Sequence, residues 1–122
     1  MVDCKVLIIE DDESARSKLA REIKKEGFSV VTAENGYIGM ELFKKENPQI
    51  IVSDLKMPGM SCMELLKIIK QSTPKSQFIL MSAFGDMDTA IEAFREGALD
   101  YLKKPIDIDL LTRALERAKE KC

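Results

Sequence analysis

Strict alternation of two kinds of segment is the feature that most constrains the fold of this chain. Five short apolar runs are each followed by a longer segment with helical periodicity, and the runs occupy 5–9, 29–33, 49–53, 77–81 and 100–104. Their Val and Ile content and their flanking turn residues predict β-strands. The first, third and fourth runs are almost continuously hydrophobic, which is typical of strands buried on both faces of a parallel sheet.

The segments between the runs predict amphipathic helices. In the first of them Ala15, Leu19 and Ile23 recur every four residues, and Gly27 is a natural stop signal. The expected helices occupy 14–26, 37–46, 61–72, 87–96 and 107–121. This βα alternation predicts a doubly wound α/β fold with a parallel sheet, right-handed crossovers and helices on both faces. No linker or repeat interrupts it, so we expect one domain over 1–122.

Composition excludes several classes of function. The net charge of −2 offers no general attraction for nucleic acid or an anionic membrane. No apolar run approaches the ~20 residues that span a bilayer, and the N-terminus does not resemble a signal peptide, so we expect a cytoplasmic protein. The absence of histidine excludes a His general base from within the chain. Cys4, Cys62 and Cys122 are too widely spaced to indicate a disulfide framework or a zinc site.

Polar residues stand where four of the predicted strands end. Glu10 and Asp11 follow the first run, Asp54 the third, Ser82 the fourth, and Lys104 ends the fifth. The carboxyl ends of parallel strands meet at one edge of an open sheet, which is where ligands bind in such folds. We therefore expect carboxylates, a hydroxyl and an ammonium group to converge there.

The acidic run Glu10–Glu13 is costly to hold beside an apolar core, because its like charges repel. A hard divalent cation relieves this repulsion, and oxygen ligands suit Mg²⁺. Together with a lysine and a hydroxyl, such a metal site predicts a cradle for a small phosphoryl group, since no Gly-rich nucleotide motif is present. The alternative is a solvated loop that caps the next helix, with Lys103 and Lys104 as ordinary surface charges.

Four motifs resemble one family across essentially the whole chain. They are "LIIEDDE", "IIVSDLKMPGM", "FILMSAFGD" and "GALDYLKKPID", and they resemble the receiver domain of bacterial two-component response regulators. Within this family, the motifs "SDLKMPGM" and "GALDYLKKPID" are similar to those in receivers of nitrogen-regulator transcriptional activators. The resemblance implies a flavodoxin-like (βα)5 fold with strand order 2-1-3-4-5. It also implies a phosphorylation-activated signalling switch, and not a turnover enzyme.

The resemblance implies a role for each site residue. Asp54 matches the aspartate that takes a phosphoryl group from the phosphohistidine of a sensor histidine kinase and becomes 4-aspartylphosphate. Glu10 and Asp11 match the acidic pair that holds Mg²⁺ together with Asp54 and the backbone carbonyl of Lys56. Ser82 and Lys104 match the hydroxyl and the lysine that bind the phosphoryl oxygens.

The family also implies how such a signal leaves the site. Tyr101 matches the aromatic switch residue that moves inward with Ser82 on activation, and the Lys104–Pro105 bond is often cis. The fourth helix, fifth strand and fifth helix would form a homodimer or meet an output domain outside this chain. Direct binding of nucleic acid or membrane by this domain is not expected.

Two departures and two rival functions complete the sequence-based expectations. Glu10 stands where many members have Asp, and Cys62 where most have Gly, which would strain the backbone if a positive φ were needed. One rival is a degenerate receiver that signals without phosphorylation. The other is a Mg²⁺-dependent phosphatase with Asp54 as nucleophile, although Lys56 stands where its second acid would be. We also expect Phe84 to shield the phosphoryl group from water.

Overall fold

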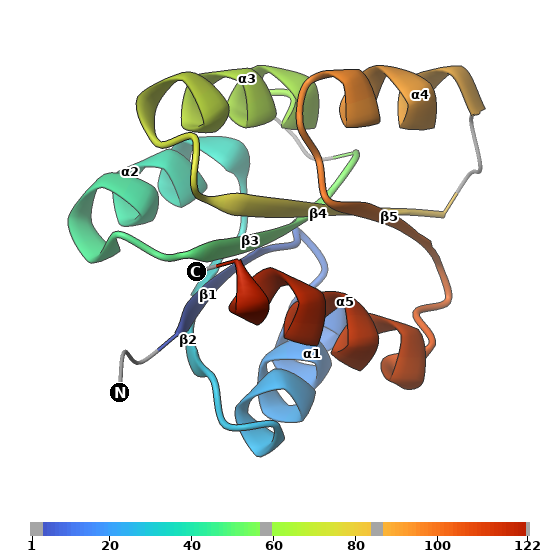
Figure 1. Cartoon of the computed structure of the whole chain (residues 1–122). Helices are drawn as coiled ribbons and strands as arrows, with labels where there is room; N and C mark the ends of the chain where they lie inside the picture. Colours follow the sequence, from blue (N-terminus) through green and yellow to red (C-terminus); the bar gives the residue numbers. More distant parts are fainter. Residues whose placement is uncertain (1–3, 57–59, 84–86, 122) are drawn as a thin grey trace.

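The sheet forms as the alternation predicts. The computed structural model describes residues 4–56, 60–83 and 87–121, and its five strands are all parallel in the order β2-β1-β3-β4-β5 (Figure 1). The strands are β1 (Lys5–Ile9), β2 (Ser29–Ala33), β3 (Ile50–Asp54), β4 (Gln77–Ser82) and β5 (Asp100–Lys103). Each predicted strand lies within one residue of the observed one, so the expected doubly wound topology is confirmed.

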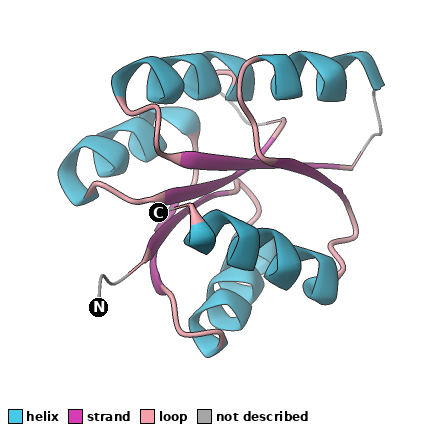
Figure 2. Ribbon diagram, in the orientation of Figure 1, coloured by secondary structure: helices cyan, strands magenta, loops and turns pink. Residues whose placement is uncertain are grey.

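The helices cover both faces of this sheet, α1 and α5 on one and α2, α3 and α4 on the other (Figure 2). Their bounds are α1 (Glu13–Lys25), α2 (Gly36–Glu46), α3 (Cys62–Ser72), α4 (Met87–Arg95) and α5 (Ile108–Glu120). Side chains of Asp12, Asn35, Ser61 and Asp107 accept amide hydrogen bonds at the starts of α1, α2, α3 and α5. Gly27 follows α1 with φ +95°, a conformation that glycine adopts without strain.

Alternation along each strand divides the core into two clusters. Ile8 and Val52 face α1 and α5, whereas Leu7 and Ile51 face α2 and α3. All four side chains are fully buried, as the hydrophobic runs predict.

None of the helices in the described part of the chain is long and apolar enough to cross a membrane.

Register decides which residues meet at the carboxyl edge. Ile9 pairs with Ser53, so Glu10, which follows β1, and Asp54, which ends β3, come next to each other at the strand ends. Asp54 in turn pairs with Met81, which places Ser82 one residue beyond it on β4. The predicted convergence of polar groups therefore occurs, because adjacent parallel strands end together.

Cys62 does not carry the backbone strain that a positive φ would impose. It is the first residue of α3 and is fully buried. Among the described non-glycine residues, positive φ occurs at Asn47, which ends α2 in the left-handed conformation. The chain accommodates a cysteine here because the position is helical.

Candidate functional site

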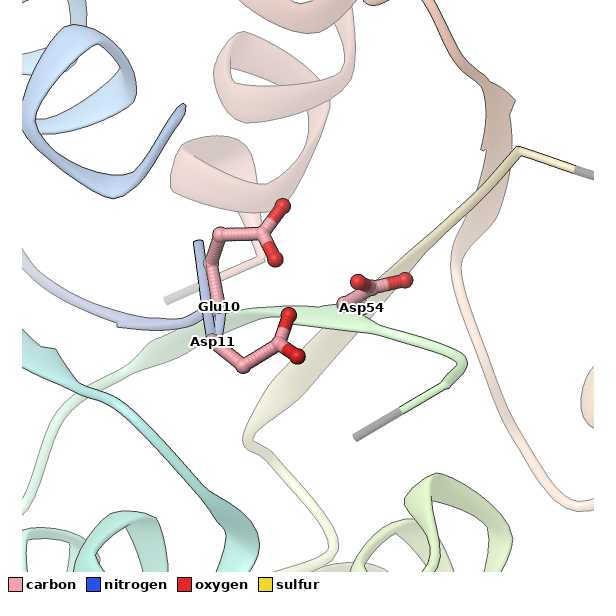
Figure 3. Close-up of side chains that lie close together, drawn as sticks. All are labelled: Glu10, Asp11 and Asp54. Carbon is pink, nitrogen blue, oxygen red and sulfur yellow. The ribbon is translucent and has the colours of Figure 1, made fainter. Parts of the chain in front are cut away.

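Three carboxylates meet at the carboxyl edge of the sheet. Ligand oxygens of Glu10, Asp11 and Asp54 all lie within 4.8 Å of one another, and Figure 3 shows the three side chains grouped at the strand ends. Glu10 is 0% exposed and Asp54 is 7% exposed, whereas Asp11 is open to solvent. This is the one such group of potential metal ligands among the described residues.

The acidic run divides between two roles. Oδ2 of Asp12 accepts a hydrogen bond of 2.8 Å from the amide of Ala15, so Asp12 caps α1. Glu13 lies in the first turn of α1, where its negative charge interacts favourably with the positive end of the helix dipole. The capping interpretation is therefore right for Asp12, while Glu10 and Asp11 belong to the carboxylate cluster.

Lys104 supplies the positive charge of the site. Its Nζ lies 2.5 Å from Oε1 of Glu10 and 3.1 Å from Oδ2 of Asp54. Partial burial by itself lowers the pKa of Lys104, but the hydrogen bonds to Glu10 and Asp54 and their charges outweigh burial and raise it. Lys104 is thus a charged counter-ion held between two carboxylates, and not an ordinary surface lysine.

Asp54 is also held through its backbone and its second oxygen. The amide of Lys56 donates to Oδ1 of Asp54 over 3.3 Å, and the hydroxyl of Ser53 donates to the carbonyl of Asp54 over 3.1 Å. The side chain of Lys56 is exposed. These contacts fix the orientation of the Asp54 carboxylate at the end of β3.

Ser82 and Tyr101 lie on the neighbouring strands. Ser82 ends β4 and is 1% exposed, and its carbonyl accepts a 2.7 Å hydrogen bond from the amide of Lys104. Tyr101 on β5 pairs with Leu80 and is half-buried against the core cluster of α2 and α3. The Lys104–Pro105 bond is cis, as the resemblance implies. Phe84 lies outside the described residues.

The thiol of Cys62 on α3 approaches Ser53 and Asp54 from the face of the sheet that α2, α3 and α4 cover. Burial raises its pKa to about 12, with a further increase from the charge of Asp54 and a decrease from a hydrogen bond with Ser53. The thiol therefore keeps its proton at neutral pH. Since a metal ligand must be a thiolate, Cys62 is unsuited to bind a metal here.

Sequence reasoning missed the contribution of Arg16. Its Nη1 donates a hydrogen bond of 2.9 Å to the backbone carbonyl of Glu10. The available signal is its place in the first turns of α1, six residues after Glu10, from which a long side chain can reach back to the strand end.

A hollow borders the site between α1 and the connection from β5 to α5. Its apolar lining is Ala15, Leu19, Pro105, Ile106 and Ile108, and Glu10, Lys18 and Lys104 complete it. The hollow therefore reaches Glu10 and Lys104 of the site along a largely apolar wall.

Comparisons with known proteins point to one family. The family model of the response regulator receiver domain matches residues 6–116. The chain is 42% identical over 113 residues to the DNA-binding transcriptional regulator NtrC of Escherichia coli (strain K12). The matched region covers 93% of this chain and 24% of that protein. It is 34% identical to the sporulation initiation phosphotransferase F of Bacillus subtilis (strain 168), covering 96% of this chain and 94% of that protein.

Solved structures agree as well. A response regulator receiver domain protein from Clostridium thermocellum has a TM-score of 0.92 at 32% identity, covering 97% of this chain and 95% of that one. The chain spans about a quarter of the length of the NtrC proteins that it matches.

Proposed function

Because this chain belongs to the family of response regulator receiver domains, we propose that it is a signalling switch activated by phosphorylation of Asp54. The phosphoryl donor is a sensor histidine kinase, and the proposed output is control of transcription, given the similarity to NtrC. One observation carries this proposal. The buried carboxylate of Asp54 stands beside Glu10 and Asp11 and is hydrogen-bonded by the ammonium group of Lys104.

The proposed reaction is a phosphoryl transfer. An oxygen of Asp54 attacks the phosphorus of the kinase phosphohistidine, the P–N bond breaks, and the imidazole nitrogen keeps the electron pair. The product is an acyl phosphate on Asp54. Lys104 supports this step because a fixed ammonium group offsets the negative charge that gathers where two anions meet.

The carboxylate cluster fits a magnesium ion. Its hard oxygen donors are the ligands that Mg²⁺ prefers, and Lys104 bonds only one oxygen each of Glu10 and Asp54. We propose that Glu10, Asp11, Asp54 and the backbone carbonyl of Lys56 hold Mg²⁺. When bound, the ion would reduce the repulsion between Asp54 and the incoming phosphoryl group.

The proposed switch uses Ser82 and Tyr101. A phosphoryl group on Asp54 carries up to about two negative charges and attracts the hydroxyl of Ser82 on the adjacent strand. Movement of Ser82 leaves space for Tyr101, which is only half-buried before activation. The repacking of α4 and β5 would then shift an equilibrium between two conformations.

The rival function as a turnover phosphatase has less support. Lys56 stands two residues after Asp54, where such an enzyme needs a second carboxylic acid. The chain contains no histidine to replace it. We therefore propose that residues 1–122 form one receiver domain of a cytoplasmic protein that assists its own phosphorylation.

Two surfaces support the proposed partners. The hollow beside Lys104 can receive an apolar side chain of the kinase while the phosphohistidine approaches Asp54. The second surface consists of β5 and the exposed apolar residues of α4 and α5, which are Met87, Ile91, Phe94 and Leu110. Two copies of the chain can form a homodimer through this surface on activation. An output domain beyond this chain would agree with the greater length of the NtrC proteins.

Phosphorylation by acetyl phosphate and Mg²⁺, measured by intact mass, tests the proposal. We expect the wild-type chain to gain one phosphoryl group and Asp54→Asn to gain none. Labelling of Asp54→Asn at the wild-type level would overturn the assignment of Asp54. A wild-type chain that is not labelled while it binds Mg²⁺ would favour the degenerate receiver.

A further inference from the structure

Arg16 links the first helix to the strand end that carries the acidic pair. Its backbone amide donates to the carbonyl of Asp12 over 2.9 Å, as part of the first turn of α1. Its side chain turns back, and Nη1 donates to the carbonyl of Glu10 over 2.9 Å in a partly buried contact. The guanidinium group therefore spans the turn between β1 and α1.

The bonded carbonyl belongs to the peptide that joins Glu10 to Asp11. On the other side of Glu10, its amide donates to the carbonyl of Ala33 at the end of β2 over 3.1 Å. The amide and the carbonyl of Glu10 are therefore both bonded, which holds the peptides on its two sides, and Arg16 is the group that holds the peptide leading to Asp11. That direction matters most for Asp11, whose exposed carboxylate has no hydrogen-bond or ion-pair partner among the described residues.

Arg16 and Lys104 bring positive charge to the cluster in different ways. Lys104 bonds the carboxylate oxygens of Glu10 and Asp54, which are themselves potential metal ligands. Arg16 bonds a backbone carbonyl and leaves every carboxylate oxygen of the cluster available. Lys104 thus competes with a cation for ligand atoms, whereas Arg16 only holds the backbone from which two ligands project.

We propose that Arg16 is a positioning residue that orients Glu10 and Asp11 for the metal ion and so sets the affinity for Mg²⁺. This inference rests on the proposed magnesium site. It predicts that loss of Arg16 weakens Mg²⁺ binding. If only charge mattered, the same change would strengthen binding, because a repelling positive charge would be gone, so the two interpretations differ in sign.

The test is calorimetric titration of the whole chain with Mg²⁺ alone, in the wild type, Arg16→Ala, Arg16→Lys and Arg21→Ala. Arg21 is the matched control, because it is an exposed arginine on the same helix without a hydrogen bond to the site. We expect Arg16→Ala to bind about tenfold more weakly, within the range for groups that orient metal ligands. Arg16→Lys, which keeps a donor and the charge, should recover part of this loss.

A second measurement separates positioning from damage to the fold. Amide hydrogen exchange of the metal-free chain should increase around residues 10–12 in Arg16→Ala, while the strands of the core keep wild-type protection. Arg21→Ala should match the wild type in both measurements. Equal or tighter Mg²⁺ binding by Arg16→Ala would overturn the inference and leave the proposed function intact. Failure of the wild type to bind Mg²⁺ would overturn both.

Discussion

The ammonium nitrogen of Lys104 lies 3.1 Å from Oδ2 of Asp54, although 50 positions separate the two residues in the sequence. The same nitrogen lies 2.5 Å from Oε1 of Glu10, which directly follows the first strand and has no exposed surface. Lys104 therefore joins the ends of β1 and β3 to the end of β5. In the metal-free site this lysine is the group that neutralises the buried carboxylates.

Replacing Lys104 should destabilise the metal-free chain more than the Mg²⁺-bound chain. In Lys104→Met the buried carboxylate of Glu10 loses its charged partner, and we expect the free energy of unfolding to fall by about 2 kcal/mol. Bound Mg²⁺ would neutralise the same carboxylate and reduce that loss. Urea unfolding with and without Mg²⁺ measures both values, and Glu10→Gln added to Lys104→Met should restore metal-free stability. An equal loss in the presence and absence of Mg²⁺ would contradict this role.

Removing Asp11 should have opposite effects on metal binding and on metal-free stability. Asp11→Ala deletes one of the three clustered carboxylates, so Mg²⁺ binding should weaken strongly. The metal-free chain should become more stable, since the repulsion with Glu10 and Asp54 is reduced. Calorimetric titration and thermal unfolding check the two effects. Replacement of Asp12, which caps α1, should instead lower stability and leave Mg²⁺ affinity near the wild-type value.

Cys62 should make the chain less stable at alkaline pH. Burial, the largest cause, raises the pKa of the thiol from its usual 9.0 to about 12, so the folded chain keeps the proton where the unfolded chain releases it. The stability that this difference contributes is complete below pH 9 and is lost as pH rises toward 12. Urea unfolding above pH 9 should show a steeper decline for the wild type than for Cys62→Ala. Parallel declines would indicate that the thiol does not contribute.

The exposed apolar residues of α4 should control association after activation. Ile91 and Phe94 are 42% and 47% exposed, and burial between two copies would stabilise a dimer. With Mg²⁺ and beryllofluoride, a stable mimic of the phosphoryl group, the wild type should shift from monomer toward dimer in sedimentation, and Ile91→Asp should not. Tyr37→Asp is the matched control, because Tyr37 is 60% exposed on α2, away from this face. Loss of dimer in both variants would argue against a specific α4 contact.

Most of the architecture could be predicted from local patterns. The hydrophobic runs located every strand to within one residue. The signal was clearest for β1, β3 and β4, because a strand buried on both faces must be apolar at nearly every position. Gly27 correctly marked the end of α1, where it adopts a positive φ that glycine tolerates best, and Gly97 has the same conformation just after α4. Residues at strand ends could then be grouped, because parallel strands bring their carboxyl ends to one edge.

The details of the candidate site could not be predicted in the same way. Four consecutive acids look alike in the sequence, yet Glu10 is fully buried, Asp11 is exposed, Asp12 caps α1 and Glu13 begins the helix. The contact of Cys62 with Ser53 also has no local signal. This contact depends on where α3 packs against β3, which brings Cys62 next to Ser53.

The sequence by itself determined the order of strands and helices, the edge at which chemistry is placed, and, through its motifs, the family. Only the tertiary structure decided that Lys104 is shared between Glu10 and Asp54, and that Arg16 holds the peptide behind the acidic pair. The physical reason is that periodicity records whether a residue faces the core or the solvent. Which groups touch across a strand edge or a turn depends on register, helix placement and side-chain direction, and these are fixed only when the whole chain packs.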